Sequence, residues 1–177
     1  MAYGPSVSSL LDGHDMYYTM EKPLWKIAAT EISKDYGLPY LAECGGNTPA
    51  GFDMQAGAES MVQMLSAVGS GADVLAGVGS CYNANGLSSE NIVIGMTLKR
   101  ASDFMCRGML FDQLEESMQS MDEQKDTGYF LMDDVTLEHM RSGEFFADST
   151  LNMAGEFKEE PSMLERAQGI IRKAKEN

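Results

Sequence analysis

The sequence has 177 residues, 44% of them hydrophobic, so it is long enough to bury a core and is interpreted as one main domain with room for a short appendage. Thirteen basic against 27 acidic residues give a formal charge of −14, which disfavours nucleic acid and anionic lipid surfaces as partners. No apolar run approaches the ~18 residues of a membrane-spanning helix, and the amino end lacks the pattern of a secretion signal. We therefore expect a cytoplasmic protein, in which the widely spaced Cys44, Cys81 and Cys106 are reduced thiols.

Strand-like and helix-like segments alternate along the first 110 residues. Pro23 suits the first turn of a helix and Gly37 its end, whereas Asp53 can cap the next helix. In chain order, the expected elements are a strand at 2–7, a loop at 10–19, a helix at 22–36, a strand at 38–42, a loop at 44–52, a helix up to residue 69, a strand at 73–78, a loop at 79–89 and a helix at 90–110.

Apolar residues at helical spacing predict which faces of the first two helices are buried. These residues are Leu24, Ile27, Ala28 and Ile32 in the first helix, and Met54, Ala58, Met61, Val62, Leu65 and Val68 in the second.

Successive strand, loop and helix units with short connections predict a parallel sheet and an α/β fold. Residues 111–126 are expected to be helical and partly solvated, and residues 128–131 to form a brief extended segment. Two further helices are predicted at 136–141 and 162–175, the second of them amphipathic with a basic last turn.

The segment from Tyr36 to Glu59, YGLPYLAECGGNTPAGFDMQAGAE, carries the strongest functional signal. It joins a buried strand, a glycine-rich loop and the start of a capped helix, which places polar groups at the mouth of an α/β sheet. Glu43 ends the strand, where an unpaired carboxylate is costly, so a paired or functional role is favoured.

These motifs resemble the trimethylamine methyltransferase family of corrinoid-dependent enzymes. The similarity runs through YGLP, D-x-Q-A-G-x-E at 53–59, A-x-x-x-G-A-D at 67–73, SxEN at 88–91 and FLMDDVTLEHM at 130–140. It covers nearly the whole chain at collinear spacing, and is therefore more specific than any single short motif.

The resemblance implies the carboxy-terminal third or so of a (β/α)8 TIM barrel, because a whole barrel needs about 200 residues or more. It places βα units of the barrel at 1–145 and a helical extension at 146–177. It also implies a cognate corrinoid protein as partner, which would supply the cobalamin, so that this chain binds no cofactor itself. The full-length enzyme is expected to be a homo-oligomer.

The loop after YGLP carries pyrrolysine in the trimethylamine enzymes of the family, and a gapless alignment puts Gly46 at that position. The chain therefore resembles the pyrrolysine-free branch, which demethylates glycine betaine or other quaternary amines. In this interpretation Gly46 has no side-chain role and leaves space for a substrate that arrives already charged.

Aromatic faces and carboxylates are the groups that hold a quaternary ammonium. We therefore predict a substrate site near the strand ends and loops. Its residues are Tyr3, Glu43, Asn47, Phe52, Asp53, Gln55 and Tyr82. Tyr17 and Tyr18 are also considered, but packing is favoured for both. With only His14 and His139, a histidine-based metal centre is poorly supported.

Purely structural roles are alternative interpretations at several of these positions. The loop glycines suit a tight turn, Asp53 a helix cap, and Cys44 a buried neutral thiol. A non-catalytic binding or assembly module derived from a truncated barrel is the alternative function. An aldolase-like barrel is disfavoured, because Lys22, Lys26 and Lys34 lie on or beside a predicted helix rather than at a strand end.

Overall fold

The computed structural model describes residues 6–153 and 159–176 and divides the chain into two compact units. Unit 1 comprises Met1–Cys106 with Asp148–Asn177, and unit 2 comprises Arg107–Ala147. The predicted boundary at residue 145 between barrel units and extension stays a prediction.

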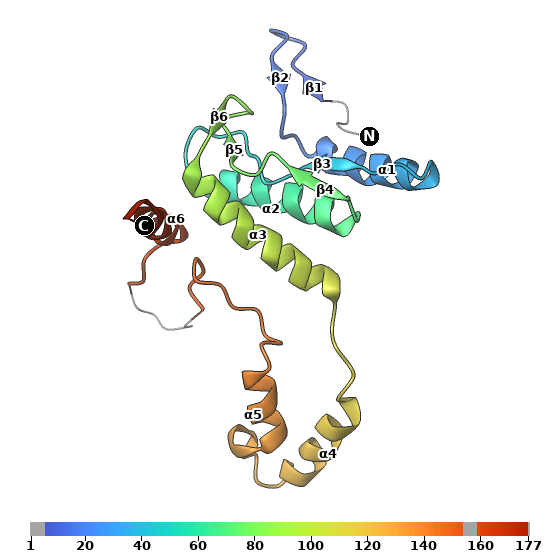
Figure 1. Cartoon of the computed structure of the whole chain (residues 1–177), viewed down its shortest axis with the longest axis vertical. Coiled ribbons are helices and arrows are strands. Elements are labelled where there is room, and N and C mark those ends of the chain that lie inside the picture. Colours follow the sequence, from blue (N-terminus) through green and yellow to red (C-terminus); the bar gives the residue numbers. More distant parts are fainter. Residues whose placement is uncertain (1–5, 154–158, 177) are drawn as a thin grey trace. The chain divides into compact units, whose positions relative to one another are not determined.

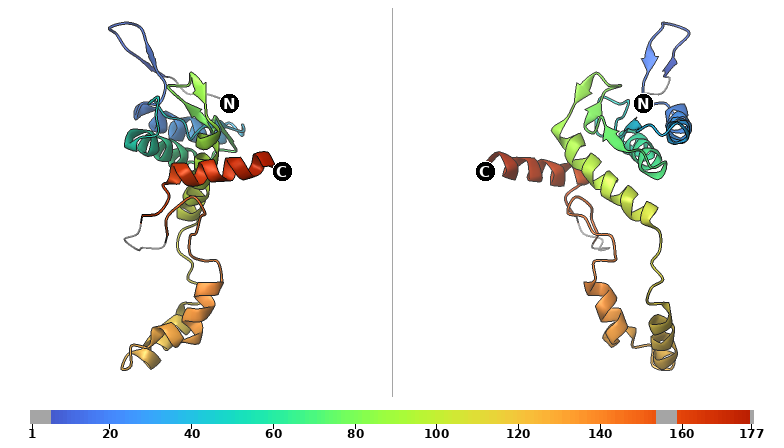
Figure 2. Two further views of the ribbon diagram at one scale, coloured as in Figure 1. Left: turned by 90° about the vertical axis from the view of Figure 1, so that its left-hand side faces the viewer. Right: turned by 45° about the vertical axis from the view of Figure 1, so that its right-hand side comes forward.

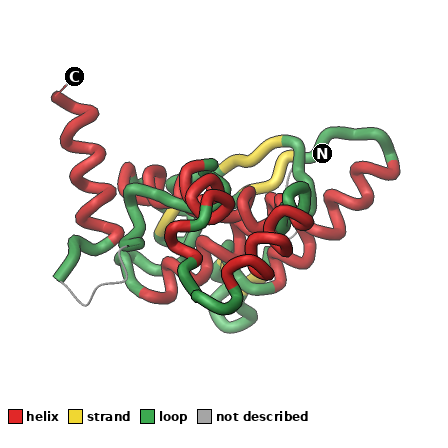
Figure 3. Tube along the Cα trace, turned by 90° about the horizontal axis from the view of Figure 1, so that it is seen from below, coloured by secondary structure: helices red, strands yellow, loops and turns green. Residues whose placement is uncertain are grey.

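Unit 1 contains most of the regular structure (Figure 1). Its elements are β1 Val7–Ser8, β2 Asp15–Met16, α1 Glu21–Asp35, β3 Leu41–Glu43, α2 Met54–Gly69, β4 Val74–Ala76, β5 Ser80–Cys81, β6 Gly86–Leu87, α3 Ser89–Arg107, whose last residue falls in unit 2, and α6 Met163–Glu176. The strands are short beside the helices (Figure 3).

The two central strands confirm the expected parallel arrangement. β3 pairs with β4 in parallel, with Leu41 opposite Val74 and Glu43 opposite Ala76, and α2 connects them. Both strands therefore end at the same edge, where Glu43 and the following loop lie. The fold of the described residues is a mixture of helices and small parallel and antiparallel sheets, without a closed barrel.

The strand expected at 2–7 is present at Val7, but the parallel arrangement expected for it is wrong. Val7–Ser8 pairs with Asp15–Met16 in an antiparallel hairpin, and residues 1–5 lie outside the described part of the chain. The hairpin forms because Gly13 adopts φ 72° and the Ser9 N–H donates to the His14 carbonyl at 2.8 Å. The expected loop at 10–19 thus contains a strand, as does the loop at 79–89, where β5 and β6 form a second hairpin.

The buried face of α1 is the polar one, which reverses the prediction from apolar spacing. Leu24 is 66% exposed and Ile27 and Ile32 are also exposed, whereas Lys22 and Lys26 are buried. The remaining buried residues of this helix are Pro23, Thr30 and Ser33.

Hydrogen bonds to α2 explain this reversal. The Lys26 ammonium donates to the Gln63 side-chain carbonyl, and the Thr30 and Ser70 hydroxyls lie 3.1 Å apart. The two helices pack side by side (Figures 1 and 2). On α2 the fully buried positions are Ala56, Glu59, Ser60, Gln63, Met64 and Ala67, whereas the predicted Met54, Ala58 and Val62 are exposed and Met61, Leu65 and Val68 are half-buried.

The apolar core of unit 1 is small. It comprises Tyr40, Ala42, Cys44, Met64 and Ala67, which come from the segment around β3 and from α2. Burial raises the pKa of the Cys44 thiol to about 11, so the thiol is neutral, as predicted.

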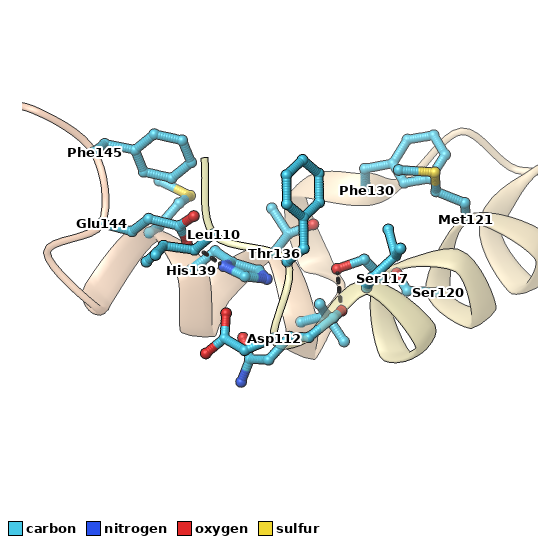
Figure 4. Close-up of a pocket in the computed structure, with 15 residues that line it drawn as sticks. Leu110, Asp112, Ser117, Ser120, Met121, Phe130, Thr136, His139, Glu144 and Phe145 are labelled. Atoms are coloured by element: carbon cyan, nitrogen blue, oxygen red, sulfur yellow. Dashed lines mark hydrogen bonds and ion pairs between the residues drawn. The ribbon is translucent and has the colours of Figure 1, made fainter. Parts of the chain in front are cut away.

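Unit 2 contains α4 Leu114–Gln124, the 3-10 turn η1 Phe130–Met132 and α5 Asp134–Arg141. The 3-10 turn replaces the extended segment predicted at 128–131. A mostly apolar pocket of about 410 Å³ lies in this unit, and the His139 ring and the Glu144 carboxylate approach to 2.7 Å beside it (Figure 4). The pocket contains none of the predicted site residues.

Candidate functional site

Glu43 lies at the carboxyl end of β3, over the end of β4. The chain makes room for its side chain at Gly77, where an added Cβ would come within 2.8 Å of Glu43 Cγ. Gly77 also has φ 75°, a conformation that favours glycine. The glycine after β4 therefore permits a half-buried carboxylate at the edge of the sheet.

One oxygen of Glu43 is held by a tyrosine. The Tyr18 hydroxyl lies 3.1 Å from Glu43 Oε1 and 2.6 Å from the Ser80 hydroxyl. The geometry allows the Tyr18 hydroxyl to donate to either oxygen, and because a phenol has one proton it donates to one of them at a time. Burial, together with the nearby carboxylate, raises the pKa of Tyr18 well above its ordinary value, so the tyrosine is protonated at neutral pH.

The other oxygen of Glu43 faces a lysine. Lys22 Nζ lies 3.1 Å from Glu43 Oε2, and the two side chains are only 4% and 11% exposed. Among the described residues, Oε2 has no hydrogen-bond partner, so its compensation is the charge of Lys22. The ammonium also lies 3.2 Å from the centroid of the Tyr17 ring, a cation–π contact.

The rings of Tyr17 and Tyr18 pack edge to face, with centroids 5.2 Å apart and planes at 77°. We call Tyr17, Tyr18, Lys22, Glu43 and Ser80 the Glu43 cluster. It combines a carboxylate with two aromatic rings, which are the groups predicted for recognition of an ammonium.

Gly46 adjoins this cluster, but the space beside it is filled. A Cβ built at residue 46 would lie 2.1 Å from Tyr18 Cζ and 2.3 Å from the Tyr18 hydroxyl. The expectation of empty space at this position is therefore wrong, because the Tyr18 ring occupies it. Gly46 is buried, and it lies in the loop that follows β3 at the edge of the parallel strands.

The side chains of the predicted residues Asn47, Asp53 and Gln55 have hydrogen-bond partners outside the Glu43 cluster. Asn47 is buried and donates to the Ser60 hydroxyl at 3.1 Å. Asp53 caps α2 by accepting from the Ala56 N–H at 2.8 Å. Gln55 donates to Glu59 at 2.7 Å.

Glu59 in turn fixes the loop, because it accepts from the Thr48 N–H at 2.6 Å. The motif D-x-Q-A-G-x-E thus builds a network that joins the loop to the first turns of α2. The spacing of the motif residues therefore serves to hold the loop against α2.

Phe52 is 46% exposed and lines a pocket of about 240 Å³ together with Asn47 and Asp53. The pocket is also lined by Asn91 of α3 and by Ser162, Met163 and Leu164 at the start of α6. None of the residues of the Glu43 cluster lines this pocket.

Tyr82 is 56% exposed and adopts φ 55°, within a run of three left-handed residues that ends at Ala84. The middle residue of the run, Asn83, accepts from the Tyr17 N–H at 2.7 Å and donates to the Asp15 carbonyl at 2.6 Å. This bridge explains the strained turn, because it fastens the β5–β6 hairpin to the segment that carries Tyr17. Tyr3 lies outside the described residues.

Sequence reasoning missed four members of the cluster. Tyr17 and Tyr18 were interpreted as packing residues, Lys22 as part of a helix, and Ser80 as part of a loop. A signal for Lys22 does exist, since Lys22, Lys26 and Thr30 recur at intervals of four residues and mark a polar stripe on α1. The apolar residues of the same helix outweighed it.

The part of the chain that the structure describes contains neither a cluster of metal ligands nor a membrane-spanning helix. No group of three or more metal-ligating side chains occurs there. None of the described helices has the length and hydropathy required to cross a membrane.

Comparison with known proteins gives the family. The model of the trimethylamine methyltransferase (MTTB) family matches residues 2–171, which is nearly the whole chain. The chain therefore belongs to the trimethylamine methyltransferase family, whose activity is methyl transfer from methylamines. A search of curated proteins found no match.

Proposed function

We propose that the chain binds a quaternary amine such as glycine betaine at the Glu43 cluster and presents one of its methyl groups to the Co(I) corrinoid of a partner protein. A tertiary amine is the second substrate class. The observation that carries the proposal is the convergence of the Glu43 carboxylate with the Tyr17 and Tyr18 rings beside Gly46, at the carboxyl end of β3.

The contact between Gly46 and Tyr18 supports the pyrrolysine-free branch. Because a Cβ at residue 46 would overlap the Tyr18 ring, this position accepts no larger residue unless the ring moves. Tyr18 is in turn fixed by Glu43 and Ser80. A reactive side chain at residue 46 would need the volume that the Tyr18 ring fills. In this chain the ring instead forms an aromatic wall of the ammonium site.

Methyl transfer from a quaternary amine requires no proton donor in such a site. When the methyl carbon of a quaternary amine is attacked, the C–N bond would break and the bonding electron pair would stay on nitrogen, so a neutral tertiary amine would leave without a proton. The residues of the cluster therefore need only to bind and orient the cation and exclude water. When bound, the corrinoid of the partner would supply the nucleophile and the acceptor of the methyl group.

The architecture that we propose is a portion of a (β/α)8 barrel, in which active sites lie at the carboxyl ends of the strands. The parallel β3–β4 pair and the position of Glu43 support this proposal. The exposed apolar residues of α1, Leu24, Ile27 and Ile32, also support it, because they give further elements a surface on which to pack. A corrinoid protein would dock over the edge that carries Glu43.

The test is a methyl-transfer assay on the full chain with its corrinoid partner and Co(I), followed by the absorbance of the corrinoid. Glycine betaine or a related quaternary amine is expected to methylate the cobalt. Transfer from trimethylamine alone, with all quaternary amines inert, would reject the branch assignment.

A binding or assembly module is the second candidate, and one observation favours it. In the described residues the parallel sheet has two strands, which supply only part of a barrel mouth. A module of this kind would be folded and monomeric, would bind its partner, and would give no methyl transfer with any amine in the same assay.

A further inference from the structure

The cation site of the Glu43 cluster already holds a cation, the ammonium of Lys22. Lys22 Nζ lies 3.1 Å from Glu43 Oε2 and 3.2 Å from the centroid of the Tyr17 ring. The Tyr18 ring centroid is 6.0 Å away. Carboxylate and aromatic rings thus surround this ammonium as they would a substrate ammonium.

A substrate ammonium that takes this position must displace Lys22, and the displaced charge then needs a new partner. Lys22 is 4% exposed at its side chain, and Glu43 Oε2 has no hydrogen-bond partner among the described residues. Breaking a buried ion pair without replacing it is strongly unfavourable. A substrate with a positive charge alone satisfies Glu43 and leaves Lys22 without compensation.

A zwitterion resolves this imbalance. Its ammonium pairs with Glu43, and its carboxylate pairs with Lys22, so one internal ion pair is exchanged for two pairs with the ligand. Lys22 is suited to the exchange because it lies in the first turn of α1 and has a flexible four-carbon side chain.

On the basis of the proposed function, we infer that Lys22 is a built-in ligand of the Glu43 cluster and selects zwitterionic quaternary amines by ion-pair exchange. Without substrate, Lys22 occupies the cation site and keeps the aromatic rings in place. When a betaine binds, Lys22 moves from Glu43 to the carboxylate of the substrate. Lys22 is thus a specificity-determining residue, and its contact with Glu43 excludes simple cations.

Binding measurements on the full chain test this inference without any corrinoid. Isothermal titration calorimetry would compare glycine betaine with tetramethylammonium, which has a similar cationic head and no carboxylate. The unmodified chain is expected to bind glycine betaine at least tenfold more tightly. Lys22→Met is expected to reverse the order, because it empties the cation site and removes the partner of the carboxylate.

Two control variants separate this role from a purely structural one. Lys22→Arg keeps the charge and is expected to retain the preference for betaine. Lys26→Met removes the next buried lysine of the same stripe, which bonds Gln63, and is expected to leave betaine preferred. Circular dichroism and thermal melting of each variant would establish that it is folded.

The outcomes are distinct. If Lys22→Met binds tetramethylammonium no more tightly than the unmodified chain does, the inference is overturned. The ion pair between Lys22 and Glu43 would then have a structural role. If Lys22→Met does not fold, equal affinity of the unmodified chain for the two ligands would overturn it as well. A different outcome would reject the proposed function alone: betaine binds with the predicted preference but transfers no methyl group to the corrinoid.

Discussion

Glu43 and Asp53 are carboxylates at the two ends of one loop, and their surroundings differ. The Asp53 side chain accepts from the Ala56 N–H at 2.8 Å and so completes the first turn of α2. Glu43 Oε2 has no hydrogen bond among the described residues and faces an ammonium. The acceptor of Asp53 is used by the backbone, whereas the charge of Glu43 is paired with a cation.

This difference extends along the loop. Asn47, Gln55 and Glu59 hydrogen-bond within the loop and the start of α2. Around Glu43, in contrast, the partners are side chains from distant segments: Tyr18, Lys22 and Ser80. Closely spaced polar residues of one motif thus form a structural network, whereas the candidate site is assembled from side chains that the fold brings together.

Among the substitutions in this loop, Glu43→Gln is expected to have the largest effect. The substitution leaves Lys22 buried without a counter-charge, and we expect it to lower the free energy of unfolding by about 4 kcal/mol. It should also weaken binding of glycine betaine more than tenfold. Denaturant unfolding and calorimetry measure the two effects.

Glu59→Gln is the matched control, because Glu59 bonds the Thr48 N–H and Gln55 and contacts no cation among the described residues. It is expected to change stability but not the preference among amines. A Glu43→Gln variant that binds betaine as tightly as the unmodified chain would remove Glu43 from the site.

Gly46→Ala tests the aromatic wall, and its expected effect is next in size. The new methyl group would overlap the Tyr18 ring, so we expect a loss of about 3 kcal/mol in stability and loss of betaine binding. Gly51→Ala, in the same loop, meets no atom within 4 Å and should change stability by less than about 0.5 kcal/mol. Equal effects of the two variants in thermal melts would show that the Tyr18 ring does not fill this space.

The sequence predicted the elements with strong local signals. The cap at Asp53, the helix that ends at Gly69 and the parallel pairing of β3 with β4 follow from capping chemistry and short connections, and the structure confirms them. The short hairpins were missed, since two-residue strands give no periodic pattern. The turn at Gly13 was the available clue to the first of them.

The candidate site was predicted less completely for a physical reason. Glu43 was identified because a carboxylate at the end of a buried strand needs compensation, but the compensating groups are 21 to 37 residues away in sequence. Apolar periodicity also assigned the wrong face of α1 to the interior, because it assumes that burial follows hydrophobicity. Here paired polar groups between α1 and α2 determine which face is buried.

The polar stripe of α1 predicts a pH dependence through Lys26. Burial lowers the pKa of Lys26 to about 8, below its ordinary value of 10.5. Between these two values the unfolded chain binds a proton that the folded chain does not, so this group makes stability rise with pH in that window.

Relative to Lys26→Met, the unmodified chain should therefore gain about 2 kcal/mol of stability between pH 8 and pH 10, at up to about 1.4 kcal/mol per pH unit. Urea unfolding of both proteins at several pH values measures this difference in stability. The contributions of the titratable groups that the two proteins share cancel in the difference. Parallel curves for the two proteins would mean that Lys26 keeps its ordinary pKa.

The smallest expected effect concerns Asp53, at the other end of the loop. Asp53→Ala removes the cap of α2 and should cost about 1 kcal/mol of stability without changing KM for the amine. Asp133→Ala removes the equivalent cap of α5, where Asp133 accepts from the Thr136 N–H at 3.0 Å, and serves as the matched control. Asp53→Asn sharpens the test, because asparagine keeps the capping oxygen and loses the charge. If Asp53 only caps the helix, Asp53→Asn retains both stability and KM, whereas a raised KM with unchanged melting temperature would make Asp53 a second ligand of the cation.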